Sequence, residues 1–189
     1  MTKNYFTNAV DLAKDICMKK LDKGDIAIDA TMGNGNDTVF LAELVGTSGE
    51  VYAFDIQKEA VNNTRKNIDD RNLSKQVKLI NDGHENMDRY IDEKVKLVIF
   101  NLGYLPKGRH DITTKATTTL KAVEKSLKLI QQNGVIILVI YYGHNQGKIE
   151  KDALEGYVKA LDQREYNVVK ASFVNQINCP PMLMVIEKR

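Results

Sequence analysis

Two glycines that follow a short hydrophobic run are the first residues in this chain with recognisable chemistry. Gly33 and Gly35 come after the predicted strand 25–30 and before a helical pattern. Because they lack a Cβ, they allow a sharp turn that brings bare backbone N–H groups close to a ligand. Asp55 closes the next predicted strand, 51–55, about 20 residues beyond Gly35, where a nucleotide-binding βαβ unit places the carboxylate that holds the ribose hydroxyls. The spacing predicts a nucleotide-like cofactor. The presence of Asp55 argues against the alternative that Gly33 and Gly35 serve only the shape of the turn and bind no ligand.

Asp37, at the predicted start of the following helix, narrows the kind of cofactor. The N-terminus of a helix attracts a pyrophosphate, and a carboxylate at that position would repel it. Gly35 is followed by Asn36-Asp37-Thr38, which fits the G-x-G-x-x-G pattern of dinucleotide-binding proteins poorly. A sulfonium cofactor without phosphate is compatible with this turn, and a nicotinamide-dependent oxidoreductase is the weaker alternative.

Helical and strand patterns alternate along the whole chain, and they must position these residues. Asn8 is the predicted cap of a first helix that ends near Lys20, and Asn133-Gly134 is predicted to end the long helix 117–130. Strands that alternate with helices indicate a parallel, doubly wound α/β sheet with helices on both faces. The last two strands leave no room for a helix between them, so they should pair as an antiparallel hairpin. The other predicted strands are 77–80, 95–100, 135–141, 168–174 and 182–186, and the other predicted helices lie near 37–44, 58–69, 85–91 and 148–161.

A mostly parallel seven-stranded sheet with an antiparallel C-terminal hairpin resembles the Rossmann-like fold of class I S-adenosylmethionine-dependent methyltransferases. The turn 29–38 is similar to their motif I, except that Thr31 replaces its first glycine. The resemblance implies that Asp29 accepts hydrogen bonds from the cofactor ammonium group, directly or through water, and that an adenine site follows the strand 77–80. Asn-Asp-Gly at 81–83 is also an ordinary turn, and Asp55 could instead cap a helix. The expected cofactor-binding residues are Asp29, Gly33, Asn34, Gly35, Asn36, Asp37, Asp55, Gln57, Asp82, His84 and Asn101.

The segment Asn101-Leu102-Gly103-Tyr104, after the predicted strand 95–100, resembles the Asn-Pro-Pro-Tyr-like motif of amino-group methyltransferases. In that motif the Asn side-chain carbonyl and the next backbone carbonyl accept hydrogen bonds from the target amine, while the aromatic ring packs beside it. Asn101, the carbonyl of Leu102 and Tyr104 would supply the same parts. Because Leu102 and Gly103 replace two prolines, the target need not be a planar base amine.

Nearly the whole chain resembles one bacterial family, MnmM or YtqB, long labelled "putative rRNA methylase". The resemblance implies methyl transfer from S-adenosylmethionine to the aminomethyl nitrogen of 5-aminomethyl-(2-thio)uridine at the tRNA wobble position, giving 5-methylaminomethyl-(2-thio)uridine. The alternatives are methylation of a base amine in rRNA or DNA, or of a protein side-chain amide, and a non-catalytic RNA-binding protein that keeps the cofactor pocket. The resemblance is carried by the turn 29–38, Asn101-Leu102-Gly103-Tyr104-Leu105-Pro106, Thr113-Thr114 with Thr117-Thr118-Thr119, Tyr142-Gly143-His144 and Pro180-Pro181.

An alkylamine target must lose a proton before it can attack the methyl group. Its pKa resembles that of lysine, about 10.4, so at neutral pH the nitrogen has no lone pair. Tyr142-Gly143-His144 is the expected source of a base, because histidine can take up a proton near neutral pH. His144 could equally be a structural residue that orients Glu150 or RNA. The expected catalytic residues are Asn101, Tyr104, Tyr142 and His144.

Basic residues gather after the Asn101 motif and indicate a partner with phosphate groups. Leu102, Lys107, Arg109, His110 and Lys115 are the expected substrate-binding residues, and the four basic side chains could grip phosphates of a tRNA anticodon stem-loop. Lys121, Lys125 and Lys128 are expected to form a solvated helix face. We recognise no appended RNA-binding module, so the catalytic domain or a homodimer would hold the RNA.

Composition and charge fit one soluble domain of 189 residues, in which 1–23 form an N-terminal helix region. The chain is 43% hydrophobic and 28% charged, with a net charge of +2 that neither indicates nor excludes a nucleic-acid binder. Cys17 and Cys179 have no C-x-x-C spacing, so neither a disulfide framework nor a metal site is expected. No apolar run approaches about 18 residues and the N-terminus lacks a signal core, so we expect a cytoplasmic protein and no membrane partner.

Overall fold

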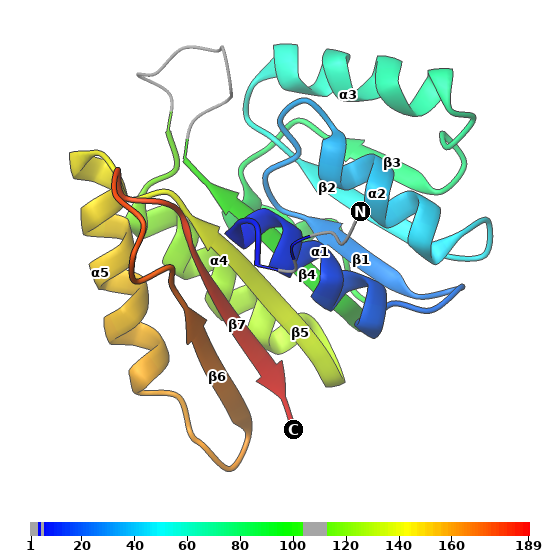
Figure 1. The fold of residues 1–189 in the computed structure, drawn as a ribbon. Helices are drawn as coiled ribbons and strands as arrows, with labels where there is room; N and C mark the ends of the chain where they lie inside the picture. The colour runs from blue at the N-terminus through cyan, green and yellow to red at the C-terminus, as the bar shows by residue number, and fades with distance from the viewer. Residues whose placement is uncertain (1–3, 5, 104–112) are drawn as a thin grey trace.

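Seven strands form one mixed sheet in the order β3-β2-β1-β4-β5-β7-β6 (Figure 1). The computed structural model describes residues 4, 6–103 and 113–189. β1 to β5 run parallel to one another, whereas β7 runs antiparallel to both β5 and β6, which confirms the predicted sheet and its C-terminal hairpin. The strands are β1 (Ile26–Asp29), β2 (Glu50–Phe54), β3 (Val77–Ile80), β4 (Val95–Leu102), β5 (Ile130–Ile140), β6 (Tyr166–Ala171) and β7 (Met182–Lys188).

Helices cover both faces of this sheet (Figure 1). α1, α2 and α3 pack against one hydrophobic core, and η1, α4 and α5 pack against a second core on the opposite face. Neighbouring strand residues such as Ala27 and Ile28, or Leu97 and Val98, belong to opposite cores because side chains alternate along a strand. The helices are α1 (Ala9–Lys20), α2 (Asn36–Val45), α3 (Lys58–Asp70), the 3₁₀ helix η1 (His84–Arg89), α4 (Ala116–Leu129) and α5 (Asn145–Lys159).

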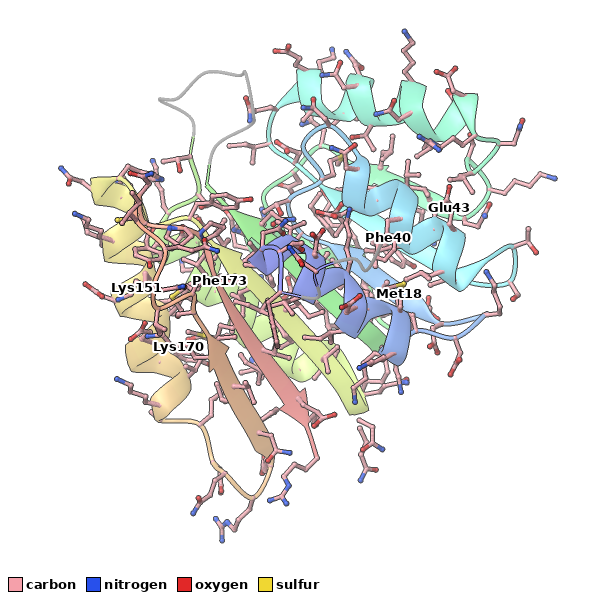
Figure 2. All side chains as sticks on the ribbon, viewed as in Figure 1. Met18, Phe40, Glu43, Lys151, Lys170 and Phe173 are labelled. Carbon is pink, nitrogen blue, oxygen red and sulfur yellow. The ribbon has the colours of Figure 1, made fainter. Side chains whose placement is uncertain are left out.

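The N-terminal helix α1 begins where the sequence predicts. The side chain of Asn8 accepts a hydrogen bond from the backbone N–H of Asp11 at 2.8 Å, which caps the helix. Lys14 of α1 lies over the ring of Phe40 in α2, with 5.4 Å between the ammonium nitrogen and the ring centroid. Phe40 and Met18 are labelled in Figure 2, where α1 and α2 lie side by side. This contact brings α1 next to the helix that follows the glycine turn.

The predicted end of the long helix at Asn133-Gly134 is wrong. α4 ends at Leu129, and β5 already begins at Ile130. Asn133, with φ 59°, and Gly134 lie inside β5, where its pairing with β4 shifts register. A Cβ on Gly134 would lie 2.8 Å from the carbonyl oxygen of Lys96, so the neighbouring strand requires a glycine. A helix C-cap and a strand irregularity use the same left-handed residues, and the sequence pattern therefore could not separate them.

The ends of other elements also differ from the prediction by a few residues, and β4 continues to Leu102, so Asn101 lies within this strand rather than after it. α5 begins at Asn145 rather than near 148, β6 spans 166–171 rather than 168–174, and β7 extends to Lys188. α1 is joined to β7 by an ion pair between Lys20 and Glu187. No helix in the described part of the chain is long and apolar enough to cross a membrane.

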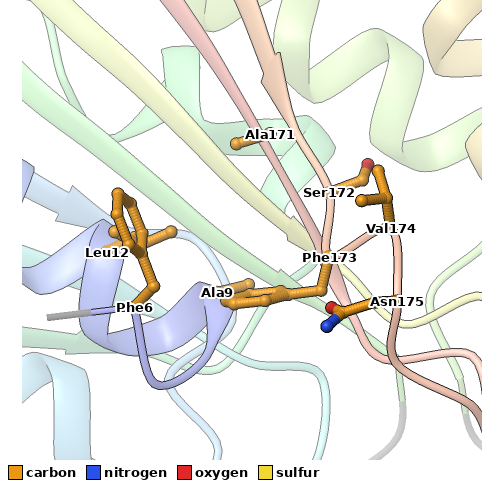
Figure 3. Close-up of a pocket in the computed structure, with 8 residues that line it drawn as sticks. All are labelled: Phe6, Ala9, Leu12, Ala171, Ser172, Phe173, Val174 and Asn175. Carbon is orange, nitrogen blue, oxygen red and sulfur yellow. The ribbon is translucent and has the colours of Figure 1, made fainter. Parts of the chain in front are cut away.

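Two hollows lie beside α1, away from the predicted site. One, of about 260 Å³, lies between the start of α1 and the chain after β6, and Figure 3 shows the residues that line it, among them Phe6, Leu12 and Phe173. The other, of about 510 Å³, runs along α1 and the outer strands β6 and β7. Among the residues that the structure describes, none of those predicted to bind the cofactor or to act in catalysis lines either hollow. The candidate site lies instead at the carboxyl edge of β1 to β5.

Candidate active site

The turn after β1 is built around Asp29, which is only 1% exposed. One of its carboxylate oxygens accepts a hydrogen bond from the backbone N–H of Thr31 at 3.1 Å, and the other accepts from the hydroxyl of Thr38 at 2.6 Å. Burial and the nearby charge of Asp37 raise the pKa of Asp29 to about 7. Asp29 therefore folds the turn and joins it to α2, and any bond to a cofactor must share oxygens that already have partners.

The two glycines of the turn have different roles. Both have positive φ, 51° at Gly33 and 82° at Gly35. A Cβ on Gly35 would lie 2.8 Å from the methyl carbon of Thr64 and 3.0 Å from its Cα, so close packing of α3 requires this glycine. The hydroxyl of Thr64 also donates to the carbonyl oxygen of Gly33 at 3.0 Å. Gly35 thus serves the contact between the turn and α3, while the backbone N–H of Gly33 faces Asp55.

Asp55 joins the turn to the end of β2. Its carboxylate accepts a hydrogen bond from the backbone N–H of Gly33 at 3.1 Å and from that of Gln57 at 2.9 Å. Burial raises the pKa of this carboxyl, although these hydrogen bonds favour its ionised form. A carboxylate has about four acceptor positions, so two remain for the vicinal hydroxyls of a ribose. Gln57 is half-buried at the N-cap of α3 and its side chain does not cap the helix.

Asn34 faces α3 instead of an open cleft. Its side-chain oxygen accepts from the amide of Asn63 at 3.1 Å, and its carbonyl oxygen accepts from the amide of Asn67 at 2.7 Å. Asn36, the first residue of α2, is exposed. Both lie on the same turn as Gly33, but the contacts assign Asn34 to the packing of α3.

Asp82 and His84 follow β3 and differ in what they can offer an adenine. The carboxylate of Asp82 accepts from the backbone N–H of Gly83, the amide of Asn86 and the hydroxyl of Tyr90, at 2.7 to 2.9 Å. His84 is buried, its Nδ1 lies 3.1 Å from the carbonyl oxygen of Ala30, and burial lowers its pKa, so the ring is neutral. Nδ1 then donates to the carbonyl, which leaves Nε2 as an acceptor; this buried atom has no hydrogen-bond partner within the described residues.

Asn101 links the glycine turn to the end of β4. Its backbone N–H donates to the hydroxyl of Thr31 at 2.7 Å, and its side-chain amide N–H₂ donates to the carboxylate of Asp37. The amide oxygen Oδ1 is buried, and no residue that the structure describes gives it a hydrogen bond. Thr31, the departure from motif I, therefore supplies the hydroxyl that holds the Asn101 backbone.

Asp37 lies between the glycine turn and the side chain of Asn101. Burial raises its pKa, while the nearby charge of Lys14 and the hydrogen bond from Asn101 favour the ionised carboxylate. An ionised Asp37 can only accept hydrogen bonds, so it fixes the Asn101 amide with N–H₂ toward the carboxylate and Oδ1 pointing away. Asp37 thus sets the orientation of the amide.

The chain after β5 lies beside the end of β4 and forms the next part of the candidate site. The backbone N–H of Tyr141 donates to the carbonyl oxygen of Leu102 at 3.2 Å, so this carbonyl has one acceptor position left for an amine. Burial raises the pKa of Tyr141, and the charge of Asp37 adds to this. A Cβ on Gly103 would lie 3.6 Å from the Cβ of Tyr141, an ordinary contact. Tyr142 is half-buried with Lys151 over its ring, 6.0 Å from the ring centroid.

His144 caps α5. Its Nδ1 accepts a hydrogen bond from the backbone N–H of Gly147 at 3.1 Å. A neutral imidazole has a single acceptor nitrogen, and this bond uses it. A Cβ on Gly147 would lie 2.2 Å from the carbonyl oxygen of Tyr141, so the start of α5 packs closely on the chain after β5. Of the two roles open to His144 from sequence, the geometry favours the structural one.

A buried carboxylate at Glu150 was not among the predicted site residues. It is 1% exposed, and its two oxygens accept from the hydroxyls of Thr114 at 2.7 Å and Thr119 at 2.6 Å. The spacing of Glu150 with the buried Leu154 and Val158 of α5 was the available signal, because it places a charged residue on the apolar stripe of a helix.

The basic residues are only partly described. Lys115 is exposed at the N-cap of α4. Lys125 is not solvated as predicted: its ammonium group donates to the carbonyl oxygen of Glu85 and pairs with Asp88 at 2.6 Å, which joins α4 to η1. In the described parts of the chain no three His, Cys, Asp or Glu side chains are grouped to hold a metal ion. The predicted residues Tyr104, Lys107, Arg109 and His110 lie outside the described residues.

The sequence matches the family described as "Putative rRNA methylase" over residues 51–187. The chain belongs to this family. Its structure is similar over 100% of both chains to a protein from Clostridium thermocellum described as a "putative rRNA-methylase", with 47% identity and a TM-score of 0.96. A protein from Streptococcus mutans described as a "putative methyltransferase", solved in complex with S-adenosylhomocysteine, is 44% identical over 100% of both chains with a TM-score of 0.89.

A plant relative carries a more specific name. The chloroplastic tRNA (mnm5s2U34)-methyltransferase of Arabidopsis thaliana is 35% identical over 190 aligned residues, which cover 95% of this chain and 69% of the relative. Family and fold together make the chain an S-adenosylmethionine-dependent methyltransferase, which confirms the predicted family, fold and cofactor. The buried acceptor at His84 and the open acceptor positions of Asp55 fit the adenosine part of this cofactor.

Proposed function

We propose that this methyltransferase methylates the aminomethyl nitrogen of 5-aminomethyl-(2-thio)uridine at the tRNA wobble position. The observation that carries the proposal is the buried Oδ1 of Asn101, which has no partner among the described residues while its amide is fixed by Asp37. An acceptor kept in this state suits a donor on the substrate, and an amine N–H is such a donor. The name of the plant relative supports the same nucleoside.

The amine would bind between two acceptors at the end of β4. Oδ1 of Asn101 and the open position of the Leu102 carbonyl oxygen would each accept one amine hydrogen, which directs the nitrogen lone pair toward the methyl group. The cofactor supplies a methyl carbon activated by the positive sulfonium. Correct positioning of two reacting groups can account for several kcal/mol of the barrier. Tyr104 would complete this pocket by analogy with the motif that the sequence resembles.

The amine must also reach the neutral state. We assign the proton acceptor to Asp37 in place of His144, because the acceptor nitrogen of His144 already caps α5. Asp37 is in contact with Asn101, and burial raises its pKa, so it holds a proton more readily than an exposed aspartate. Desolvation of the ammonium group in the closed site would lower its pKa and favour the transfer.

The cofactor would lie across the ends of β1, β2 and β3. Asp55 would hold the ribose hydroxyls, and Nε2 of His84 would accept from the adenine amino group, because the oxygens of Asp82 already have three donors. The turn at Gly33 would face the methionine part, with Asp29 near its ammonium group. Asn36, Gln57 and Asn34 would lie at the rim.

The RNA would be held by its phosphates around the mouth of this site. Lys115 is exposed at the N-cap of α4, next to the chain that follows Asn101, and Lys107, Arg109 and His110 would act with it. The flipped uracil could stack on an aromatic ring, as bases of single-stranded RNA commonly do. We propose a tRNA anticodon stem-loop as the partner, a homodimer as a way to enlarge the surface, and the cytoplasm as the location.

The test is methylation of defined tRNA by the purified protein. tRNA that carries 5-aminomethyl-2-thiouridine is incubated with S-adenosylmethionine, digested to nucleosides and analysed by mass spectrometry. We expect 5-methylaminomethyl-2-thiouridine to form at the expense of the unmethylated nucleoside. A methylated base amine in the same tRNA or in rRNA, with the aminomethyl group unchanged, would show that the protein is a base methyltransferase instead.

A further inference from the structure

Glu150 is a buried charge that the proposed methyl transfer does not use directly. Its carboxylate lies between α4 and α5, and both oxygens accept a hydrogen bond from a threonine hydroxyl, Thr114 before α4 and Thr119 within it. Removing a carboxylate from water destabilises the folded state unless such donors compensate. Burial accordingly raises the pKa of Glu150, and the two hydroxyls counteract that rise.

Thr114 connects this carboxylate to the chain that carries Asn101. Its backbone N–H donates to the carbonyl oxygen of Gly103 at 3.0 Å. Gly103 lies two residues after Asn101, and Thr114 is where the chain returns after the segment 104–112. The pair Gly103–Thr114 therefore brings the two ends of that segment together, and the bond to Glu150 anchors the pair to α5. Thr119, in contrast, lies inside α4, where its backbone N–H donates to the carbonyl oxygen of Lys115 at 2.9 Å.

Glu150 is connected to the chain after β5 through α5 itself. His144 caps this helix by accepting from the backbone N–H of Gly147, and a Cβ on Gly147 would lie 2.2 Å from the carbonyl oxygen of Tyr141, so the start of α5 packs closely on that chain. The segment 141–144 forms the wall beside Leu102, through the bond between Tyr141 and Leu102. Glu150 thus contacts the Gly103–Thr114 side directly, and it belongs to the helix whose start packs against the other side.

We propose that Glu150 is a positioning residue of the methylation site. It fixes the Gly103–Thr114 pair relative to His144, and so holds the Leu102 carbonyl and the Asn101 amide at the separation that the amine needs. The inference rests on the proposed function, because it assumes that the substrate amine binds between the end of β4 and the chain after β5. Glu150 contacts neither cofactor nor amine in this scheme.

The first test compares two glutamates of α5. Glu150→Gln keeps the size of the side chain and removes its charge. Glu155→Gln makes the same change at a half-buried residue that pairs with Lys151 and, across to β6, with Lys170, both labelled in Figure 2. We expect Glu150→Gln to lower kcat on the tRNA at least tenfold, with S-adenosylhomocysteine affinity within twofold of the unsubstituted protein. Glu155→Gln should change neither by more than twofold.

The second test separates positioning from simple stabilisation. Thr114→Val and Thr119→Val each remove one hydroxyl bond to Glu150 and keep the side-chain shape, so they should lower Tm by similar amounts. Thr114→Val keeps the backbone bond to Gly103 but releases the Gly103–Thr114 pair from Glu150, and we expect it to lower kcat about tenfold while Thr119→Val stays within threefold. Equal effects of the two valines on kcat, or full activity of Glu150→Gln, would overturn the inference. If the unsubstituted protein leaves 5-aminomethyl-2-thiouridine unmethylated, the proposed function is wrong instead.

Discussion

The two halves of the candidate site differ in how their polar groups are satisfied. In the cofactor half, after β1 to β3, the carboxylates of Asp29, Asp55 and Asp82 each accept two or more hydrogen bonds from the protein. In the acceptor half, after β4 and β5, Oδ1 of Asn101 is buried and has no partner in the described residues. The carboxylates of the first half thus have partners within the protein, and the open buried acceptor there is Nε2 of His84, whereas in the second half the open acceptor belongs to the amide proposed to bind the amine.

This difference affects how much each half contributes to the stability of the fold. A buried polar atom without a partner costs about 1–3 kcal/mol, so a site that keeps one gains specificity at the expense of folding. The cofactor half avoids that cost at its three carboxylates and gains a rigid turn. Thr31 and Asp37 belong to the turn but contact Asn101, so the rigid half holds the reactive half in place.

The largest effect should come from Asn101→Ala, which removes the reserved acceptor. We expect kcat to fall about 10²- to 10³-fold, because the amine loses the group that directs its lone pair. S-adenosylhomocysteine affinity, measured by calorimetry, should stay within a few-fold. Asn63→Ala is the matched control. It removes the hydrogen bond that the side-chain amide of Asn63 donates to Asn34 in the cofactor half, and it should retain activity. Loss of cofactor binding in Asn101→Ala would show that the two halves are not separable.

Gly35→Ala should destabilise the cofactor half through a steric clash, not through the loss of a hydrogen bond. The added Cβ would clash with Thr64 at a positive φ, and we expect the free energy of unfolding to fall by about 2–4 kcal/mol. Gly156→Ala is the control, because a Cβ there meets nothing within 4 Å on the exposed side of α5. It should stabilise the protein by about 0.5–1 kcal/mol. Urea unfolding measures both, and an unchanged Gly35→Ala variant would contradict the assigned packing role.

Asp29→Asn should change how stability depends on pH. The pKa of Asp29 is raised from 3.8 to about 7, so its protonated form favours the folded state. This contribution is complete below about pH 4 and is lost as the pH rises through about 7. The stability of Asp29→Asn relative to the unsubstituted protein should therefore increase with pH, by up to about 1.4 kcal/mol per pH unit in that window. A difference in urea unfolding that is the same at pH 5 and pH 8 would argue against a buried, raised carboxyl.

Asp82→Asn should change the pH dependence of stability in the opposite direction to Asp29→Asn. Although burial acts to raise it, the pKa of Asp82 is lowered by hydrogen bonds from Asn86 and Tyr90. Its ionised form thus favours the folded state at neutral pH, and that contribution is lost as the pH falls. The relative stability of Asp82→Asn should decrease, not increase, as the pH rises from the acid range.

The smallest effect should come from Lys115→Ala at the mouth of the acceptor half. Loss of one phosphate contact should weaken tRNA binding about two- to fivefold at moderate salt and reduce the slope of log affinity against log salt by about 1. Lys128→Ala, at the opposite end of α4, is the control and should leave the slope unchanged. Filter binding at several salt concentrations measures both, and equal slopes for the two variants would place the RNA elsewhere.

Sequence alone determined the fold and indicated which residues form the candidate site. Alternating strand and helix patterns, the spacing from Gly35 to Asp55 and the Asn101 motif depend on local periodicity and on the rule that strand ends meet at one edge, so they can be read from the chain. The local pattern failed at Asn133-Gly134, because the same left-handed residues serve a helix end and a strand irregularity.

Tertiary structure alone decided how those residues share their hydrogen bonds. The sequence showed Asp37 beside the glycines, but not that α2 brings it to the Asn101 amide. It showed Glu150 and His144, but not that one carboxylate anchors Thr114 or that the acceptor nitrogen of His144 caps α5. These roles depend on which donors and acceptors long-range packing brings within about 3 Å, and local sequence spacing does not encode that distance.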